Sequence, residues 1–447
     1  MRGLMPTTHT SFLAVSVALT FVVLPGRDAN AAAPSYQVTD LGVNGGIFAD
    51  VGDINNSGQI VGVMFPEGIS AGGTYPDGSI NRAFCTDDPV LDRVADNLGL
   101  PSSLQSAGGN SYAMCVNNSG QILAWAIALN ATGPYVPWHS YVIPSSGTLT
   151  NATDLGTLGG DYNYANGLND LGQVVGRVGF TSNSPWHAYL YTFGSPLKDL
   201  GTLGGLYSEA YGINNLGQIT GTAENSARFP RAFRTAPNAT IALTNDLGSL
   251  GGKYVNGRVI NDAGQVAGLA SIADESASHL FRTEPNADIN PATDDLGTLS
   301  GGTHIVPLDI NSFGDLVGWG NCSNSSQHAF VVLGSTLYDL NNLIDPSLGI
   351  TLQVAAGIND RGDIVARGTI SGSDYAHAFL LKPIVLLSIS LVGNQVIVSW
   401  SPSATSWTLQ TNNNPATGTW GDYVGVVSDN HVTNSVSAAN LFYRLKQ

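Results

Sequence analysis

The chain has 447 residues, and its 33 acidic residues outnumber its 17 lysines and arginines, which gives a formal net charge of −16. This balance excludes the clustered positive charge that binding to nucleic acid or to an anionic membrane surface requires. Only 11% of the residues are charged whereas 54 are glycine, a composition typical of short strands joined by tight turns.

The N-terminal segment has the features of a secretory signal. Arg2 precedes an apolar run over 12–24, and the small residues Ala29-Asn30-Ala31 follow it. We predict a signal peptide over 1–31, with cleavage after Ala33 as an alternative. No cysteine follows closely enough for a lipid anchor, and no later segment has 18 uninterrupted apolar residues. The sequence therefore predicts a secreted or cell-surface protein without a membrane span.

One short motif dominates the remainder of the chain. It is Asn-x-x-Gly, typically within Ile-Asn-x-x-Gly-Gln, and it is followed by an apolar residue. It begins at Asn55, Asn117, Asn169, Asn214, Asn261, Asn311 and Asn359. Successive copies are 45 to 62 residues apart, a period that indicates a repeat architecture. Asparagine can bond to its own backbone and glycine accepts positive φ, so each copy predicts a hairpin loop between two strands.

Two further motifs recur with the loops. An Asp-Leu-Gly segment, often followed by Gly-Gly, begins at Asp40, Asp154, Asp199, Asp246 and Asp295. A strand of the form His-Ala-Phe begins at His187, Arg231, His279, His328 and His377, with His139-Ser140-Tyr141 as a looser match. Each repeat therefore contains about four short strands and no helix.

Four strands in each of seven repeats predict an all-β fold, a seven-bladed β-propeller over 32–383. The first repeat begins with an Asp-Leu-Gly strand over 36–42, and the last repeat ends after 377–381 without one. We therefore expect 36–42 to close the ring as the outermost strand of the seventh blade. The alternative is an open, solenoid-like stack.

The combination of Asp-Leu-Gly, Gly-Gly, Asn-x-x-Gly-Gln and His-Ala-Phe resembles the HAF family of probable extracellular bacterial repeats. The resemblance extends over 36–383. It implies secretion and a propeller-like body, and it implies no reaction, cofactor or catalytic residue.

The repeats stop after Pro383. Alternating strands follow over 395–400, 407–410, 420–427 and 441–445. This pattern, over 384–447, is similar to a short fibronectin-type or immunoglobulin-like β-sandwich, incomplete or docked because of its small size.

The recurring histidines and aspartates are predicted to be structural, because a catalytic group is needed only once. We expect the histidines to bond to a neighbouring blade. Three cysteines, Cys85, Cys115 and Cys322, are too dispersed in sequence for zinc; Cys85 and Cys115 either pair in a disulfide or remain buried thiols.

The remaining candidates for chemistry are weak. The segment Asp53 to Gly58 resembles the start of a calcium loop, but Met64 stands where a bidentate glutamate is needed. No Gly-x-Ser-x-Gly or phosphate-binding glycine loop occurs. Glycosidase chemistry needs two carboxylates in one pocket. The non-repeated candidates are Glu67, Asp77, Asp87, Asp88, Asp92, Glu224, Asp274 and Glu275, and loop exposure explains them equally well.

Tryptophans outside the recurring motifs provide the better functional signal. Trp125, Trp138, Trp186 and Trp319 lie in or beside predicted strands, where a role in the core competes with a role in carbohydrate binding. The sequence thus favours a non-catalytic binding or surface protein for extracellular polysaccharide or protein. The alternative is a propeller glycosidase or lyase with its site at the channel mouth. No catalytic, cofactor or metal residue is assigned.

Overall fold

In the computed structural model of the chain, the described residues are 34–42, 49–64, 81–87, 91–92, 95–104, 109–128, 139–160, 162–179, 185–373, 375–385, 387–392, 395–400, 408–413, 419–425, 427, 431–435 and 442–446. The predicted signal peptide and its cleavage site lie outside them. The chain divides into two compact units, one over 37–382 and one that combines 1–36 with 383–447.

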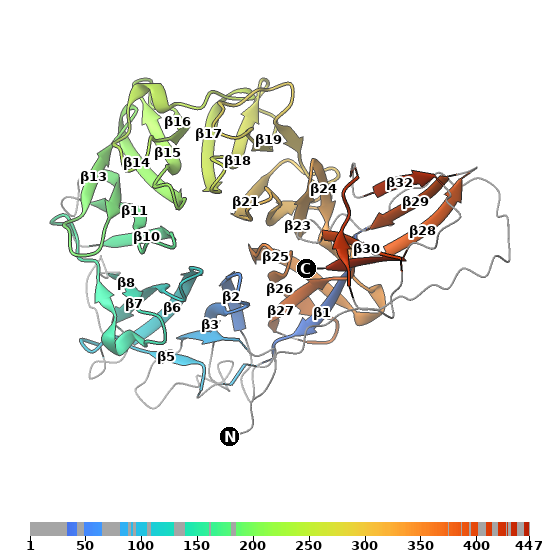
Figure 1. Cartoon of the computed structure of the whole chain (residues 1–447). Coiled ribbons are helices and arrows are strands. Elements are labelled where there is room, and N and C mark those ends of the chain that lie inside the picture. Colours follow the sequence, from blue (N-terminus) through green and yellow to red (C-terminus); the bar gives the residue numbers. More distant parts are fainter. Residues whose placement is uncertain are drawn as a thin grey trace. The chain divides into compact units, whose positions relative to one another are not determined.

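Strands of the 37–382 unit form seven sheets among the described residues, and Figure 1 shows them around a common centre. Sheet 1 contains β2 (Ala49–Ile54), β3 (Ile60–Met64), β4 (Arg82–Thr86) and β5 (Asn97–Gly99). Sheet 2 contains β6 (Gly109–Val116), β7 (Ile122–Ala128), β8 (His139–Ile143) and β9 (Thr153–Asp154). Sheet 3 contains β10 (Asn163–Leu168), β11 (Val174–Gly179), β12 (Trp186–Tyr191) and β13 (Lys198–Gly201).

The next three sheets have the same antiparallel order. Sheet 4 contains β14 (Gly204–Ile213), β15 (Ile219–Asn225) and β16 (Pro230–Arg234). Sheet 5 contains β17 (Gly251–Ile260), β18 (Val266–Ile272), β19 (Ser278–Arg282) and β20 (Asp295–Gly297). Sheet 6 contains β21 (Ile305–Ile310), β22 (Leu316–Asn321), β23 (Gln327–Leu333) and β24 (Thr336–Asp339). Short 3-10 helices occupy connections at η2 (Leu149–Asn151), η3 (Leu243–Asn245), η4 (Leu340–Asn342) and η5 (Pro346–Leu348).

Sheet 7 combines segments from the two ends of this unit. Its strands are β25 (Ile350–Ile358), β26 (Ile364–Ile370), β27 (Ala376–Pro383) and, next to β27, β1 (Tyr36–Asp40). The N–H of Leu41 donates to the carbonyl of Ala378 at 3.0 Å, and the Leu41 side chain is fully buried.

The all-β prediction is confirmed, with one local difference. The expected fourth strand of sheet 4, at Asp246, is reduced to a single bridge between Phe233 and Asp246. The 3-10 helix η3 ends at Asn245, immediately before this position.

The aromatic residue of the His-Ala-Phe motif packs on a glycine of the second strand. Gly62 and Gly318, for example, are the cross-strand partners of Phe84 and Phe330. A methyl group on either glycine would lie 2.8 Å from the aromatic ring opposite it. Both rings are fully buried, and burial of such a side chain contributes about 1.5–3 kcal/mol. The backbone carbonyls of Asp50 and Val306 would be closer still to such a methyl group. Alanine takes the place of this glycine opposite Tyr141 in sheet 2 and opposite Phe379 in sheet 7.

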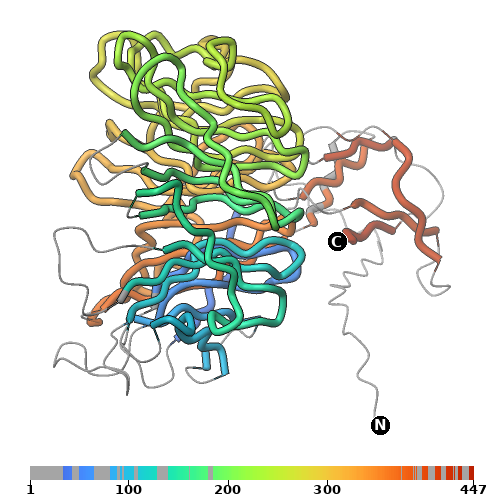
Figure 2. The backbone as a smooth tube through the Cα atoms, turned by 90° about the vertical axis from the view of Figure 1, so that its left-hand side faces the viewer, coloured from blue at the N-terminus to red at the C-terminus, as the bar shows by residue number. Residues whose placement is uncertain are grey.

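The core lies between the sheets. Val61 of sheet 1 belongs to one buried cluster with Ile122 of sheet 2, and Ile60 of sheet 1 belongs to another with Val365 of sheet 7. Strands of successive sheets are in contact, as β3 with β6 and β15 with β17 are, and Figure 2 shows the backbone of this unit from the side. Each sheet thus buries its faces against its neighbours.

The second unit has two three-stranded sheets and its own core. One sheet contains β28 (Leu387–Val392), β29 (Gln395–Trp400) and β32 (His431–Ser435). The other contains β31 (Gly421–Asp422), β30 (Thr408–Asn412) and β33 (Phe442–Lys446). Val398, Trp400, Leu409, Val432 and Tyr443 from both sheets form one buried cluster. The strand expected over 420–427 is only two residues long.

No helix among the described residues has the length and apolar character needed to span a bilayer.

Candidate functional site

The Asn-x-x-Gly loops have one construction in all seven sheets. In sheet 4, Asn214 Oδ1 accepts the backbone N–H groups of Leu216 at 3.2 Å and Gln218 at 2.9 Å. In every loop, the asparagine Oδ1 accepts a hydrogen bond from the backbone N–H of the residue four positions later. The loop glycines have φ between +73° and +91°, a region open to glycine. The predicted hairpin mechanism is confirmed.

The loop asparagines also bond to one another. In each loop, Asn Nδ2 donates to the backbone carbonyl of the loop asparagine in the next sheet, at 2.8–3.4 Å. The order is Asn55, Asn117, Asn169, Asn214, Asn261, Asn311, Asn359 and again Asn55. These asparagines are 3–6% exposed. We call this series the asparagine circle; it has no open end.

The residues that follow the loop asparagines form a second, more exposed ring. Backbone N–H groups of Asn118 and Asn215 donate to the carboxylates of Asp170 and Asp262, each at 2.7 Å. The N–H of Ser312 similarly donates to Asp360 at 2.9 Å. These three carboxylates therefore serve as acceptors for neighbouring loops.

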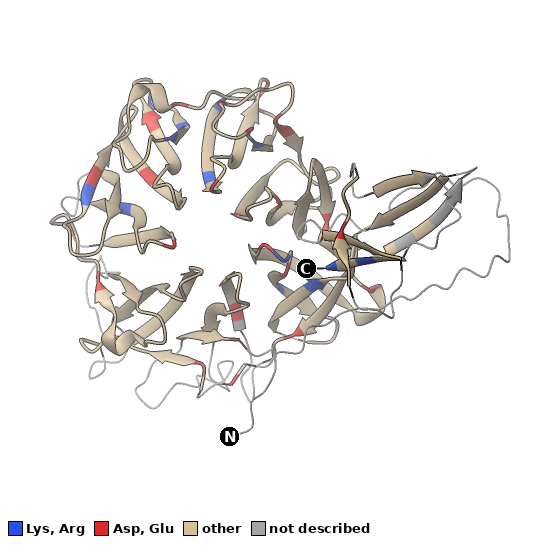
Figure 3. Ribbon diagram, in the orientation of Figure 1, with Lys and Arg blue, Asp and Glu red and all other residues tan. Residues whose placement is uncertain are grey.

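A cavity of about 610 Å³ lies along the axis of the unit, bounded by the first strands of all seven sheets. This volume is within the range of small-ligand sites, roughly 300–1,000 Å³. Charged residues are sparse on the sheets, and acidic segments lie at the inner ends of several of them (Figure 3). We call this space the axial cavity.

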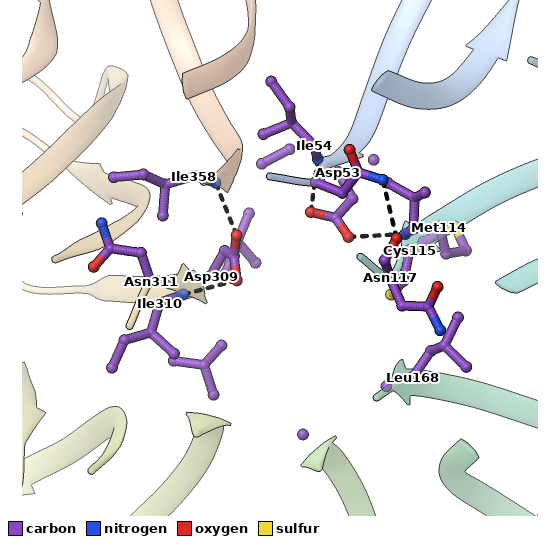
Figure 4. A pocket seen from close by; sticks show the side chains of 18 of the residues that line it. Asp53, Ile54, Met114, Cys115, Asn117, Leu168, Asp309, Ile310, Asn311 and Ile358 are labelled. Atoms are coloured by element: carbon purple, nitrogen blue, oxygen red, sulfur yellow. Dashed lines mark hydrogen bonds between the residues drawn. The ribbon is translucent and has the colours of Figure 1, made fainter. Parts of the chain in front are cut away.

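Two half-buried carboxylates stand beside the axial cavity, Asp53 on β2 and Asp309 on β21 (Figure 4). Asp53 accepts the N–H groups of Ile54 at 2.7 Å and Val116 at 2.9 Å. Asp309 accepts those of Ile310 and Ile358, each at 2.8 Å. Each aspartate thereby connects its own sheet to the next one.

Burial dominates the electrostatics of this pair. It raises the pKa of Asp53 well above its usual value, and the charge of Asp309 raises it further. Burial likewise raises the pKa of Asp309 to about 6, although the N–H donors lower it in part. The two groups can therefore differ in protonation near neutral pH.

The equivalent position, two residues before the loop asparagine, differs in the other sheets. Its occupants are Cys115, Gly167, Gly212, Val259 and Gly357. Burial raises the pKa of the Cys115 thiol well above its usual value, with the charges of Asp53 and Asp309 adding to the effect. The two carboxylates are therefore specific to sheets 1 and 6.

Arginines and aromatic groups occupy other parts of the cavity wall. Arg367 contacts Asp50 at 3.0 Å, yet burial raises the pKa of Asp50 more than Arg367 lowers it. The Arg258 guanidinium lies 4.3 Å from the centre of the Tyr211 ring, and its buried Nε has no hydrogen-bond partner. The wall thus offers both hydrogen-bond donors and acceptors to a polar ligand.

A strip of half-buried aromatic residues extends from the cavity wall across sheets 2 to 4. Trp125 lines the cavity and meets Tyr164 edge-on, with ring centres 5.8 Å apart. The Arg177 guanidinium lies 5.0 Å from the Tyr164 ring and 5.1 Å from the Trp186 ring. The ring centres of Trp186 and Tyr207 are 4.4 Å apart. We call these five residues the aromatic strip.

The aromatic strip changes the interpretation of the tryptophans. Trp125, Trp186 and Trp319 are half-buried and belong to none of the core clusters described above. The structure therefore places these three side chains outside the core clusters of the described residues. Trp138 lies outside the described residues.

The recurring histidines and aspartates form pairs within single sheets. The pairs are His139–Asp154, His187–Asp199, His279–Asp295, His328–Asp339 and His377–Asp40, with N–O distances of 2.7–3.0 Å. Arg231 replaces the histidine in sheet 4 and contacts Asp246 at 3.0 Å. The expected bond to a neighbouring blade is wrong, because each pair connects the third strand of a sheet with its outer edge.

Other predicted candidates do not converge on the axial cavity. Asp53 does not begin a calcium loop, because both its carboxylate oxygens accept backbone N–H groups. The described members of the non-repeated acidic set do not line the cavity: Asp87, Asp92, Glu224, Asp274 and Glu275. Glu67, Asp77 and Asp88 lie outside the described residues.

Cys85 and Cys115 do not form the disulfide that the sequence left open. All three cysteines are free, and the Cys115 thiol contacts the carbonyl of Asn166 at 3.4 Å. Cys322, however, lies beside His328 and Asp339. Residues that are dispersed in sequence are therefore brought close together at this position.

Sequence reasoning missed Asp309, Asp50, Arg258 and Arg367. A signal for Asp309 was present: when the seven loops are aligned, only Asp53 and Asp309 are acidic two positions before the asparagine. Nothing in the sequence placed the other three at the axis.

No protein-family model matches the chain, and no curated protein matches its sequence. Among solved structures, it is similar to TolB from Acinetobacter baumannii, with 11% identity, a TM-score of 0.39, and coverage of 72% of this chain and 63% of TolB. It is also similar to the β-propeller domain of the Trilobed protease from Pyrococcus furiosus, with 11% identity, a TM-score of 0.35, and coverage of 67% and 100%. A fucose-specific lectin from Aleuria aurantia matches with 10% identity, a TM-score of 0.29, and coverage of 83% and 97%. The match spans less than two thirds of TolB, and likenesses this distant support no argument about function.

Proposed function

We propose that residues 37–382 form a seven-bladed β-propeller closed by β1, and that the protein is a secreted, non-catalytic binding protein for a neutral extracellular polysaccharide. The pairing of β1 with β27 and the unbroken asparagine circle support closure. The aromatic strip is the observation that carries the binding proposal.

The aromatic strip suits a sugar chain because pyranose rings present apolar faces that stack on aromatic side chains, while their hydroxyls need polar partners. The Arg177 guanidinium lies against the Tyr164 and Trp186 rings and donates from Nη1 to Glu209 at 3.0 Å, so polar groups accompany the rings. The strip reaches the axial cavity at Trp125, where amides and carboxylates are available. A net charge of −16 opposes polyanions, so the proposal is limited to neutral polysaccharides.

Binding is tested by screening the purified protein against neutral and uronic-acid polysaccharides, followed by calorimetry with the strongest neutral binder. We expect Trp186→Ala and Tyr207→Ala to weaken binding about tenfold or more, since loss of one stacked aromatic costs about 1–2 kcal/mol. Trp319→Ala is the matched control, because Trp319 is equally half-buried but contacts His304 in sheet 6. Equal loss in all three variants, or no neutral binder, would overturn the proposal.

One observation favours a second function, a propeller glycosidase. Asp53 and Asp309 are non-repeated carboxylates beside one cavity, and both have raised pKa values, as a general acid requires. Against this function, both oxygens of each aspartate already accept backbone N–H groups. Reducing-end release from the bound polysaccharide, abolished by Asp53→Asn and by Asp309→Asn, would establish the enzyme; no release supports a binding protein.

Two proposals concern the ends of the chain. The signal-like segment over 1–31 supports export, and N-terminal sequencing of the exported protein should begin at Ala32; an intact Met1 would contradict export by cleavage. The common core of the two C-terminal sheets supports a small β-sandwich over 384–447. Limited proteolysis after Lys382 should release it as a resistant fragment, whereas its complete digestion would contradict an independent module.

A further inference from the structure

We propose that Cys322, His328 and Asp339 of sheet 6 form a zinc-binding site. One ligand atom from each residue lies within 4.8 Å of the others. Among the residues that the structure describes, this is the one group of three such side chains with metal-ligand spacing. The proposal is independent of polysaccharide binding.

The local fold brings the three residues together from separate strands. Cys322 directly follows β22, His328 lies on β23, and Asp339 ends β24. His328 Nδ1 is 2.7 Å from Asp339 Oδ2, and its Nε2 is 3.1 Å from the hydroxyl of Ser326. The side chains of His328 and Asp339 are 24% and 17% exposed, so the site is accessible but partly shielded.

Among the described residues, a thiol lies beside the histidine–aspartate pair in sheet 6 alone, since Cys115 of sheet 2 is not grouped with His139 and Asp154. His187–Asp199, for instance, has the same geometry, but sheet 3 contains no cysteine. The recurring pair explains why histidine and aspartate are adjacent, and it does not explain Cys322. The strand pairing thus supplies two preorganised ligands, and Cys322 adds the third.

The chemistry of the three groups favours zinc. Thiolate, imidazole and carboxylate are its usual protein ligands, at about 2.0–2.3 Å, which places ligand atoms about 3–4 Å apart on a tetrahedral ion. Side-chain rotations that move atoms by about 1 Å suffice to reach this geometry from a maximum separation of 4.8 Å. On binding, the Cys322 S–H bond breaks, an S–Zn bond forms and one proton passes to solvent; water completes the fourth position.

Titration of the metal-free full chain with Co²⁺ tests the site, because a cobalt–thiolate bond produces a charge-transfer absorption that other ligands do not. We expect saturation at one Co²⁺ per chain, displacement by Zn²⁺, and loss of the charge-transfer band in Cys322→Ser. Asp339→Asn should weaken Zn²⁺ binding about 10- to 100-fold. Cys115→Ser should leave the band unchanged.

A second pair of variants separates metal ligation from a structural role. His328→Gln should weaken binding at least tenfold, whereas His279→Gln, which disrupts the equivalent pair in sheet 5, should not. Circular dichroism verifies that the variants remain folded. Absence of the band in the unmodified protein, or its persistence in Cys322→Ser, would overturn the proposal.

Discussion

The asparagines of the circle directly follow the first strands of the seven sheets, and the positions two residues earlier lie on those strands, yet the two sets differ in sequence. The circle has asparagine in every sheet, whereas the earlier positions carry aspartate, cysteine, glycine or valine. Each circle asparagine completes its own loop and bonds to the next sheet, so a substitution in one sheet removes contacts in two. Six of the seven earlier positions line the axial cavity, and Gly357 is the exception. The repeated asparagines therefore hold the loops of neighbouring sheets together, whereas the varied positions determine which groups line the cavity.

Removal of one asparagine of the circle should have the largest effect on the free energy of unfolding. Asn214→Ala removes the acceptor of two loop N–H groups and the buried hydrogen bond that Asn214 donates to Asn261, and the Asn214 side chain is itself buried. We expect a loss of about 3 kcal/mol or more in the free energy of unfolding, because buried groups remain unpaired. Denaturant titration measures it.

Asn215→Ala is the matched control. Asn215 bonds to Asp170 and Asp262, but it lies in the more exposed ring, where water can replace it. Asn215→Ala should lower the free energy of unfolding by about 1 kcal/mol. Equal losses in the two variants would contradict the distinction between circle and ring.

Asp309, beside the axial cavity, should make the stability of the protein depend on pH. The pKa of Asp309 rises from a usual value of 3.8 to about 6 on folding, so between these values the folded state binds more protons than the unfolded state. Stability should therefore fall as pH rises from about 4 to about 6, by about 2–3 kcal/mol from this group. In Asp309→Asn this decline should be smaller, as measured by unfolding at several pH values.

Asp274→Asn is the control for the decline in stability between about pH 4 and 6. Asp274 is fully exposed, and hydrogen bonds from Ser276 lower its pKa, so its titration acts below about pH 4. The decline between pH 4 and 6 should remain in this variant. A decline that also persists unchanged in Asp309→Asn would show that burial of Asp309 does not control it.

The repeated part of the fold could be predicted from sequence because its physics is local. The Asn-x-x-Gly loops follow from glycine at positive φ and from asparagine bonding to its own backbone, and both are visible in one segment. The pairing of Asp40 with His377 was also accessible, because it is the repeat pattern continued across the two chain ends.

The site was less accessible because it depends on contacts between different sheets. Asp53 bonds to Val116 of the next sheet, and Arg177 lies against two rings of sheet 3 and reaches Glu209 of sheet 4. Cys322 meets Asp339 through strand pairing that the sequence does not specify residue by residue. Such contacts leave no periodic signal.

The smallest expected effect concerns the outer edge of the sheets, far from the axial cavity. The hydrogen bond that His139 donates to the Asp154 carboxylate raises the pKa of His139 above its usual value, although burial opposes the increase. The stabilising effect of His139 is therefore complete below about pH 6.5 and is lost as pH rises through its folded-state pKa. Because the His139 side chain is 36% exposed, His139→Gln should cost less than about 1 kcal/mol. The cost should be greater at pH 5.5 than at pH 8.5 in paired denaturant titrations. A greater cost at the higher pH would mean that neutral His139 is the stabilising form, and the pair would then act through packing and not through charge.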